Sequence, residues 1–371
     1  MKKFNDLLSL SIANMGGSGL TAIFWFIVAA LLVPSEFGEI QYFISIAGLA
    51  YTISLLGTGE VISVYTAKKI KLQPTLILLS LIAGIIASVV ILFLYSKIEM
   101  SFLIIGFIIN DIALGYLLGN KFFGTYSKYL ITQKALVLGL GITFYFIFGV
   151  DGILFALALS NIHFIILICK ISKYSKINFP LLKTRLGFVT NSYLISAIGI
   201  AKNNLDKIIV VPLIGFEQLG NYALALQVYA VSMMFANIIY RYTLPHDSVG
   251  ETTTKIKILA LFSSVMISIL VILLAPLIIP TIFPEYVDAS YAIQIISLAI
   301  IPSTITLLLT SKILGNEKSR ILVISRIIFA SIFIGLVVTL TPIYGIVGTT
   351  TGFVIASITQ CIILVLYSKL K

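Results

Sequence analysis

The chain has 371 residues, of which 59% are hydrophobic and only 11% are charged, and its formal net charge is +11. Because about a quarter of the residues in a soluble globular domain are charged, this composition excludes an ordinary soluble domain and indicates an integral membrane protein. The apolar runs have the length of roughly 20 residues that a helix needs to cross a bilayer, so we predict an all-α membrane protein.

Twelve apolar segments follow one another along the chain, and each is long enough to cross the bilayer as one helix. The predicted spans are residues 7–33, 40–66, 75–96, 100–120, 129–149, 152–170, 187–214, 218–240, 257–284, 290–311, 320–341 and 345–367. An even number of crossings places both termini on the same side of the membrane.

Basic residues gather in alternate gaps between these spans, and the gaps on the other side keep only Lys97. The first set contains 20 of the 25 basic residues: Lys2, Lys3, Lys68, Lys69, Lys71, Lys121, Lys128, Lys170, Lys173, Lys176, Lys183, Arg185, Arg241, Lys255, Lys257, Lys312, Lys318, Arg320, Lys369 and Lys371. By the positive-inside rule this side is cytoplasmic, so we expect a cytoplasmic-membrane protein with both termini in the cytoplasm. The net charge then reflects topology and anionic membrane lipids, and a nucleic acid partner is not required.

The sequence lacks the motifs of several kinds of chemistry. It contains no GxxxxGK[ST] phosphate loop, so ATP hydrolysis by that route is excluded. Its two cysteines, Cys169 and Cys361, and its two histidines, His163 and His246, do not form a disulfide framework or a metal-ligand pattern. The outer gaps are short turns that leave no room for a catalytic domain. We therefore expect no enzymatic activity, no metal and no cofactor.

Features of the first six spans recur in the last six. The sequence Lys121-Phe-Phe-Gly124 after the fourth span is matched by Lys312-Ile-Leu-Gly315 after the tenth. Because each repeat has an even number of spans, both halves of the chain start on the same side of the membrane. We therefore predict two six-helix lobes related by a pseudo-two-fold axis along the membrane normal, with a central cavity between them.

The predicted lobes are residues 1–172 and 187–371, and a basic cytoplasmic linker, residues 173–186, joins them. The linker is either a solvated tether between the lobes, whose lysines fix the membrane topology, or a docking segment for a partner protein.

Several segments resemble a known family of membrane proteins. They are residues 203–222 (NNLDKIIVVPLIGFEQLGNY), residues 34–39 (PSEFGE) with 45–49 (SIAGL), and residues 342–348 (PIYGIVG). They are similar to the polysaccharide transporter branch of the multidrug/oligosaccharidyl-lipid/polysaccharide exporter superfamily, which contains the O-antigen-type flippases. The resemblance implies a two-lobed helical bundle that moves a polyprenyl-linked oligosaccharide from the cytoplasmic to the outer leaflet.

Charged residues inside the predicted spans are the first candidates for a binding site. A charge that faces lipid at a helix centre costs roughly 2.5 to 3.5 kcal/mol on an insertion scale, so these side chains are expected to face protein or water. The seventh span carries Lys202, Asp206 and Lys207. Lys202 and Asp206 share one helix face and could form a structural pair; alternatively, one excess cation together with Asn203 and Asn204 faces the cavity and holds an anionic headgroup.

Further candidates lie in other spans. Lys134 in the fifth span and Arg326 in the eleventh occupy corresponding positions of the two halves, where they either face the cavity or extend back to the interface. Glu60 and Asp111 are interpreted as partners of these bases or as proton or cation sites. Asn14 is a candidate for the cavity lining, although close helix packing also explains the glycines that follow it.

These residues suggest an anionic cargo. A phosphate linkage crossing the bilayer needs a basic partner, because an unpaired charge is very costly in a low-dielectric medium. We therefore expect a transporter that flips a polyprenyl-(pyro)phosphate-linked oligosaccharide by alternating access, with membrane lipids around it. Two alternatives remain: a drug/cation antiporter of the same superfamily, and a non-transporting scaffold that recruits glycosyltransferases.

Overall fold

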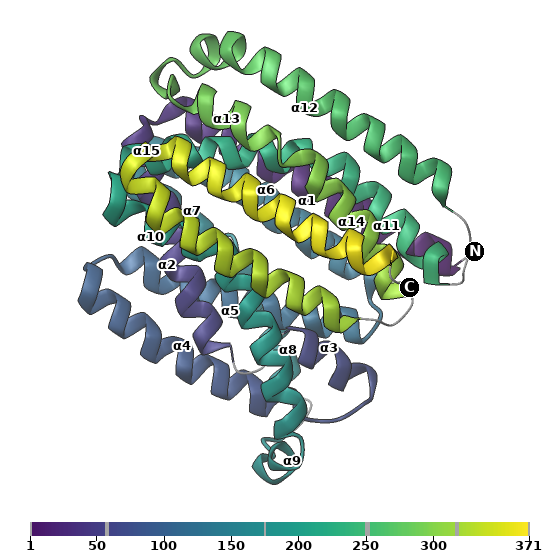
Figure 1. The fold of residues 1–371 in the computed structure, drawn as a ribbon. Helices are drawn as coiled ribbons and strands as arrows, with labels where there is room; N and C mark the ends of the chain where they lie inside the picture. Colours follow the sequence, from purple (N-terminus) through teal and green to yellow (C-terminus); the bar gives the residue numbers. More distant parts are fainter. Residues whose placement is uncertain (1, 56–58, 174–175, 249–252, 316–318, 370–371) are drawn as a thin grey trace. The chain divides into compact units, whose positions relative to one another are not determined.

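The computed structural model describes residues 2–55, 59–173, 176–248, 253–315 and 319–369 (Figure 1). Every regular element in these ranges is helical, as the composition predicted. The elements of the first half are α1 (Lys2–Leu31), α2 (Pro34–Ser54), α3 (Gly59–Ala67), α4 (Gln73–Tyr95), α5 (Ile98–Gly119), α6 (Phe123–Phe148), α7 (Val150–Leu159), η1 (Ile162–Phe164), α8 (Ile165–Lys173) and α9 (Phe179–Lys183). Those of the second half are α10 (Leu186–Ser232), α11 (Met234–Ser248), α12 (Thr254–Ile282), η2 (Pro284–Tyr286), α13 (Ala289–Ser297), α14 (Ile300–Gly315) and α15 (Ser319–Lys369).

Among the described residues, eight helices are long and apolar enough to cross a membrane, or up to ten if two bent pairs each count as one span. The bent pairs are α2 with α3 and α13 with α14, and each bends by 41°. Two helices, α10 and α15, are too long for one crossing, and each is divided by a glycine. Gly215 in α10 has φ 82° and Gly345 in α15 has φ 57°, values that are accessible to glycine and strained for other residues. Divided in this way, the helices follow the twelve predicted spans.

The break in α15 reverses the direction of the chain (Figure 1). A similar turn connects α6 to α7, where Gly149 has φ 69°. Three residues after each turn glycine, Gly152 and Gly348 lie so close to a backbone carbonyl of the preceding helix that an added Cβ would come within 2.3 Å and 2.4 Å of the carbonyl oxygen. The two halves of the sequence therefore share a glycine-dependent turn at corresponding positions.

The helices form two compact units that are each discontinuous in sequence. Unit 1 comprises Met1–Trp25 and Tyr42–Leu205, and unit 2 comprises Phe26–Gln41 and Asp206–Lys371. In unit 1, α5 packs against α3, α4 and α7, and its side chains Leu103, Ile108 and Ile112 are fully buried. In unit 2, α13 and α14 pack against α12 and α15, with Ile293 and Ile296 in the core.

Unit 2 contains a reciprocal close contact between two turns that are far apart in the sequence. An added Cβ at Gly38 would lie 1.9 Å from the backbone oxygen of Phe216, and one at Gly220 would lie 1.9 Å from the backbone oxygen of Pro34. Each helix therefore places a glycine against the backbone of the other, which is how small residues permit close helix crossings in membranes. Nearby, the Tyr286 hydroxyl donates a hydrogen bond of 3.0 Å to the Leu32 carbonyl and fixes the end of α1 in the same unit.

Candidate functional site

Lys134 on α6 is a half-buried cation in unit 1. Its Cγ would lie 3.5 Å from a Cβ added to Gly17, so the aliphatic part of Lys134 packs across the glycine of α1. Within the described ranges, no carboxylate lies within ion-pair distance of Lys134. Lys134 therefore carries a positive charge in a membrane-spanning helix without an acidic partner in that part of the chain.

The surroundings of Lys134 along α1 are open. Among the described residues, no heavy atom lies within 4 Å of a Cβ added at Gly16 or Gly19, and the same is true of Gly139 on α6. Close helix packing therefore accounts for Gly17 but not for its two neighbouring glycines. The half-buried Asn14 begins this stretch, and its carbonyl accepts a hydrogen bond of 2.8 Å from the Ser18 hydroxyl.

The two carboxylates predicted inside the second and fourth spans lie close together, at the break between α2 and α3. Asp111 on α5 accepts a hydrogen bond from the backbone N–H of Gly59, the first residue of α3, and a second from the Tyr51 hydroxyl. A carboxylate at this position is favourable because the N–H groups of a helix N-terminus carry partial positive charge. Glu60 follows in the first turn of α3 and is exposed. Among the described residues, neither acid forms an ion pair with a base.

The structure describes two of the three charged side chains of the seventh span, Asp206 and Lys207. Asp206 on α10 is 6% exposed, and its Oδ2 accepts a hydrogen bond of 3.1 Å from the Tyr222 hydroxyl. Its Oδ1 has no hydrogen-bond partner within the described part of the chain, and the neighbouring Lys207 is half-buried. The side chains of Lys202 and Asn203 lie outside the described residues, so the Lys202–Asp206 pair stays a prediction.

Arg326 is exposed on the first helix of α15 and belongs to unit 2. No ion pair or hydrogen bond from its guanidinium to another described residue is present. Lys134 and Arg326, which the sequence placed at corresponding positions of the two halves, therefore both lack an acidic partner among the described residues. No group of three or more His, Cys, Asp or Glu side chains in those ranges is placed to hold a metal ion.

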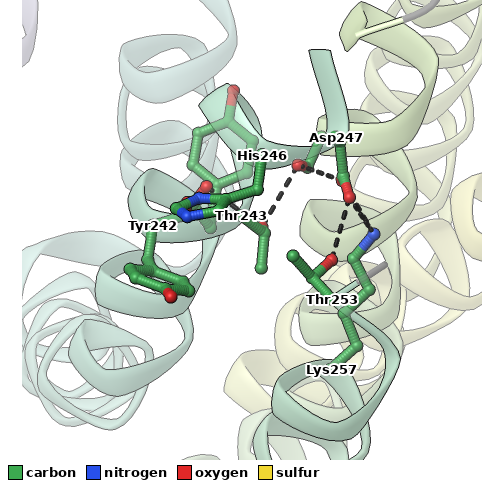
Figure 2. Close-up of polar contacts among 8 residues, drawn as sticks. Tyr242, Thr243, His246, Asp247, Thr253 and Lys257 are labelled. Carbon is green, nitrogen blue, oxygen red and sulfur yellow. Dashed lines mark hydrogen bonds and ion pairs between the residues drawn. The ribbon is translucent and has the colours of Figure 1, made fainter. Parts of the chain in front are cut away.

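A polar cluster that the sequence did not predict is centred on Asp247 in unit 2, and Figure 2 shows its contacts. Asp247, near the end of α11, accepts two hydrogen bonds of 2.7 Å from the Lys257 ammonium of α12. Thr253 and Ser311 donate to the same carboxylate at 2.9 Å and 2.6 Å, so α11, α12 and α14 are tied together at one carboxylate. The sequence signal was an acid, Asp247, ten residues before Lys257 on the side of the membrane where the basic residues gather.

We expect Asp247→Asn to lower the free energy of unfolding by about 1–3 kcal/mol, because it leaves the Lys257 ammonium without its counter-charge. Burial opposes ionisation of Asp247, but the hydrogen bonds from Lys257, Ser311 and Thr253 hold its pKa below the ordinary value. The stabilisation is therefore present above the unfolded-state pKa of about 3.9 and is lost as the pH falls through the lower folded-state pKa. Thermal unfolding in detergent should show a gap between wild type and Asp247→Asn at pH 7 that closes below about pH 4. A gap that is equal at both pH values would contradict this assignment.

The fold can be compared with known proteins. No protein-family model and no curated protein sequence matches the chain. A structure of the lipid II flippase MurJ in an inward closed conformation matches with a TM-score of 0.82 and 15% sequence identity, over 97% of this chain and 87% of that chain. An inward-facing multidrug resistance MATE family transporter of the MOP superfamily matches with a TM-score of 0.72 and 15% identity, over 97% and 94% of the two chains.

A third structure is that of a MOP superfamily transporter from Pyrococcus furiosus, for which the reverse polarity of the binding pocket suggests a different function. It matches with a TM-score of 0.62 and 15% identity, over 98% of this chain and 95% of that chain. These neighbours are transporters, and the fold that the sequence resemblance implied is confirmed. The chain is a multi-pass, all-helical membrane protein with the fold of the MOP-superfamily transporters.

Proposed function

We propose that the protein flips a polyprenyl-(pyro)phosphate-linked oligosaccharide from the cytoplasmic to the outer leaflet for the synthesis of a cell-surface glycan. The observation that supports this proposal most strongly is Lys134, a half-buried intramembrane cation with no acidic partner among the described residues. A charge of this kind is costly unless it meets an anion, and a phosphate linkage supplies one. The match to a lipid II flippase over nearly the whole chain agrees with a cargo of this class.

In this proposal, each part of the substrate meets a suitable environment. Lys134 and Arg326 attract the phosphates, with Asn14 and the seventh-span residues Lys202, Asn203 and Lys207 as further polar contacts. The sugars occupy a water-filled cavity between two lobes, residues 1–172 and 187–371, and the isoprenoid tail stays in lipid. Both termini are cytoplasmic, and the lobes rock to change the accessible side. No bond is made or broken, so the protein acts without enzymatic turnover.

The drug/cation antiporter is the second candidate, and one observation favours it. Asp206 is a buried acid in a membrane-spanning helix, with Lys207 acting electrostatically on it, and a buried carboxylate suits a cation or a proton. The other buried-span acid, Asp111, already accepts hydrogen bonds from Gly59 and Tyr51. The intramembrane bases without acidic partners favour the anionic cargo.

The proposal is tested by reconstituting the purified protein in proteoliposomes with two cargoes. The first is a fluorescent lipid-linked oligosaccharide, whose headgroup becomes accessible to an impermeant quencher when it is flipped. The second is a cationic dye, tested under proton and sodium gradients. We expect flipping of the first and no accumulation of the second. Dye transport without flipping would establish the antiporter, and neither activity together with crosslinking to glycosyltransferases would establish the scaffold.

A further inference from the structure

Two basic segments that are about 100 residues apart in the sequence lie side by side in unit 1. The first is the turn of residues 68–71 between α3 and α4, and the second is the segment of residues 176–188, which contains α9. Figure 1 shows the short helix α9 just beyond the end of α8. Neither segment contains an acidic residue.

Three contacts hold the second segment against α3 and α4, the helices on either side of the turn. The backbone N–H of Asn178 donates a hydrogen bond of 2.8 Å to Oγ1 of Thr75, in the first turn of α4. The ring of Phe188 lies 5.6 Å from the ring of Tyr65 on α3, and the Arg185 guanidinium acts electrostatically on the same tyrosine. Asn178 also accepts a hydrogen bond of 2.9 Å from the Leu181 N–H, which starts α9. The segment therefore has a defined position on unit 1.

The combined surface displays cations and large apolar side chains together. Its exposed cations are Lys68, Lys69, Lys71, Lys176, Lys183 and Arg185. Between them, Ile177 is 50% exposed, Phe179 is 51% exposed and Leu186 is 46% exposed. We call these nine side chains the basic-apolar surface. Lysine and arginine beside exposed aromatic and aliphatic groups are typical of segments that lie in the headgroup region of a membrane.

We propose that the basic-apolar surface binds the anionic phospholipid headgroups of the bilayer, with Phe179 and Ile177 inserted at the level of the acyl-chain boundary. The charge complementarity is complete, since six cations face a negative lipid surface and no acid opposes them. The segment connects two membrane-spanning helices, so it is held within reach of the bilayer on the predicted cytoplasmic side. A nucleic acid would satisfy the cations but leave Phe179 and Ile177 in water.

The insertion is measured with a single tryptophan. Trp25 is the only tryptophan of the chain, so Trp25→Phe together with Phe179→Trp gives a reporter on this surface. The reporter protein is placed in nanodiscs of phosphatidylcholine alone, or with 30% (about one lipid in three) phosphatidylglycerol, and is quenched by brominated acyl chains. We expect clear quenching that increases with phosphatidylglycerol and decreases as salt screens the charges. Absent quenching, or quenching independent of the anionic lipid, would overturn the proposal.

A charge-removal variant tests the electrostatic part. Lys176→Gln, Lys183→Gln and Arg185→Gln together should reduce the retention of phosphatidylglycerol relative to phosphatidylcholine by at least about tenfold, as each basic residue near an anionic surface contributes about a fivefold effect. The matched control neutralises three exposed cations elsewhere, Lys128, Lys255 and Lys312, and should leave that ratio within about threefold of wild type. An equal loss in both variants, with unchanged thermal unfolding, would show a non-specific effect of net charge and would contradict a dedicated surface.

Discussion

Gly220→Ala should destabilise the protein by about 3 kcal/mol or more, because the added methyl group meets a backbone oxygen that cannot rotate away. The Cβ would lie 1.9 Å from the Pro34 oxygen, and Gly38→Ala would place a methyl group 1.9 Å from the Phe216 oxygen. A flexible side chain could move aside at such a distance, but backbone cannot move without shifting a helix. We expect the thermal unfolding temperature in detergent to fall by several degrees for each single variant.

The reciprocal geometry gives this prediction a sharper form. Either alanine separates the two turns and so relieves part of the clash that the other would make. The double variant Gly38→Ala, Gly220→Ala should therefore cost clearly less than the sum of the two single changes. Gly335→Ala and Gly139→Ala are matched controls, since no atom of the described part of the chain lies within 4 Å of a Cβ added at either position. These controls should be neutral or slightly stabilising, and additive single and double effects at Gly38 and Gly220 would show that the contact is not shared.

Lys134→Gln should reduce the flipping of a lipid-linked oligosaccharide by about 10- to 100-fold, a loss of about 1.4–2.8 kcal/mol of stabilisation of the anionic headgroup. Gln keeps most of the side-chain volume over Gly17 but removes the charge, so the fold should be unaffected. Lys134→Arg should restore most of the activity, because the charge returns. Arg326→Gln should have an effect of the same direction in the second unit.

Exposed cations earlier on the same helices provide the control for this prediction. Lys128 on α6 and Arg320 on α15 are exposed and lie near the predicted cytoplasmic ends. Lys128→Gln and Arg320→Gln should retain at least about half of the wild-type rate, since these cations lie at the ends of the predicted spans, at the cytoplasmic interface, and not inside the membrane. If they reduce flipping as strongly as Lys134→Gln and Arg326→Gln, the cations act through topology and not through the substrate.

The sequence predicted the number and order of the helices well, because crossing a bilayer requires long apolar runs. It also placed the ends of spans seven and eleven next to Gly215 and Gly345, where a proline and a glycine follow one another closely. It did not predict the bends between α2 and α3 or between α13 and α14, since hydropathy measures how apolar a segment is and not whether its helix is continuous.

The candidate site was predictable only in part, for a related reason. The energetic cost of a charge in lipid identifies Lys134 and Asp111 from the sequence alone. It does not identify which neighbour each charge meets, so the pairing of Asp111 with the Gly59 N–H and the Tyr51 hydroxyl required the structure. The Asp247 cluster was missed because one of its partners, Ser311, is distant in the sequence and carries no charge.

In the proposed mechanism, bases inside the membrane recognise the phosphate of a lipid-linked glycan. The most direct measurement compares the affinity of the detergent-solubilised protein for the same short-chain glycolipid with and without its pyrophosphate. We predict that wild type binds the pyrophosphate form at least about tenfold more tightly, and that Lys134→Gln with Arg326→Gln removes this preference. Equal affinity of wild type for both forms, or a preference that the double variant keeps, would contradict the claim.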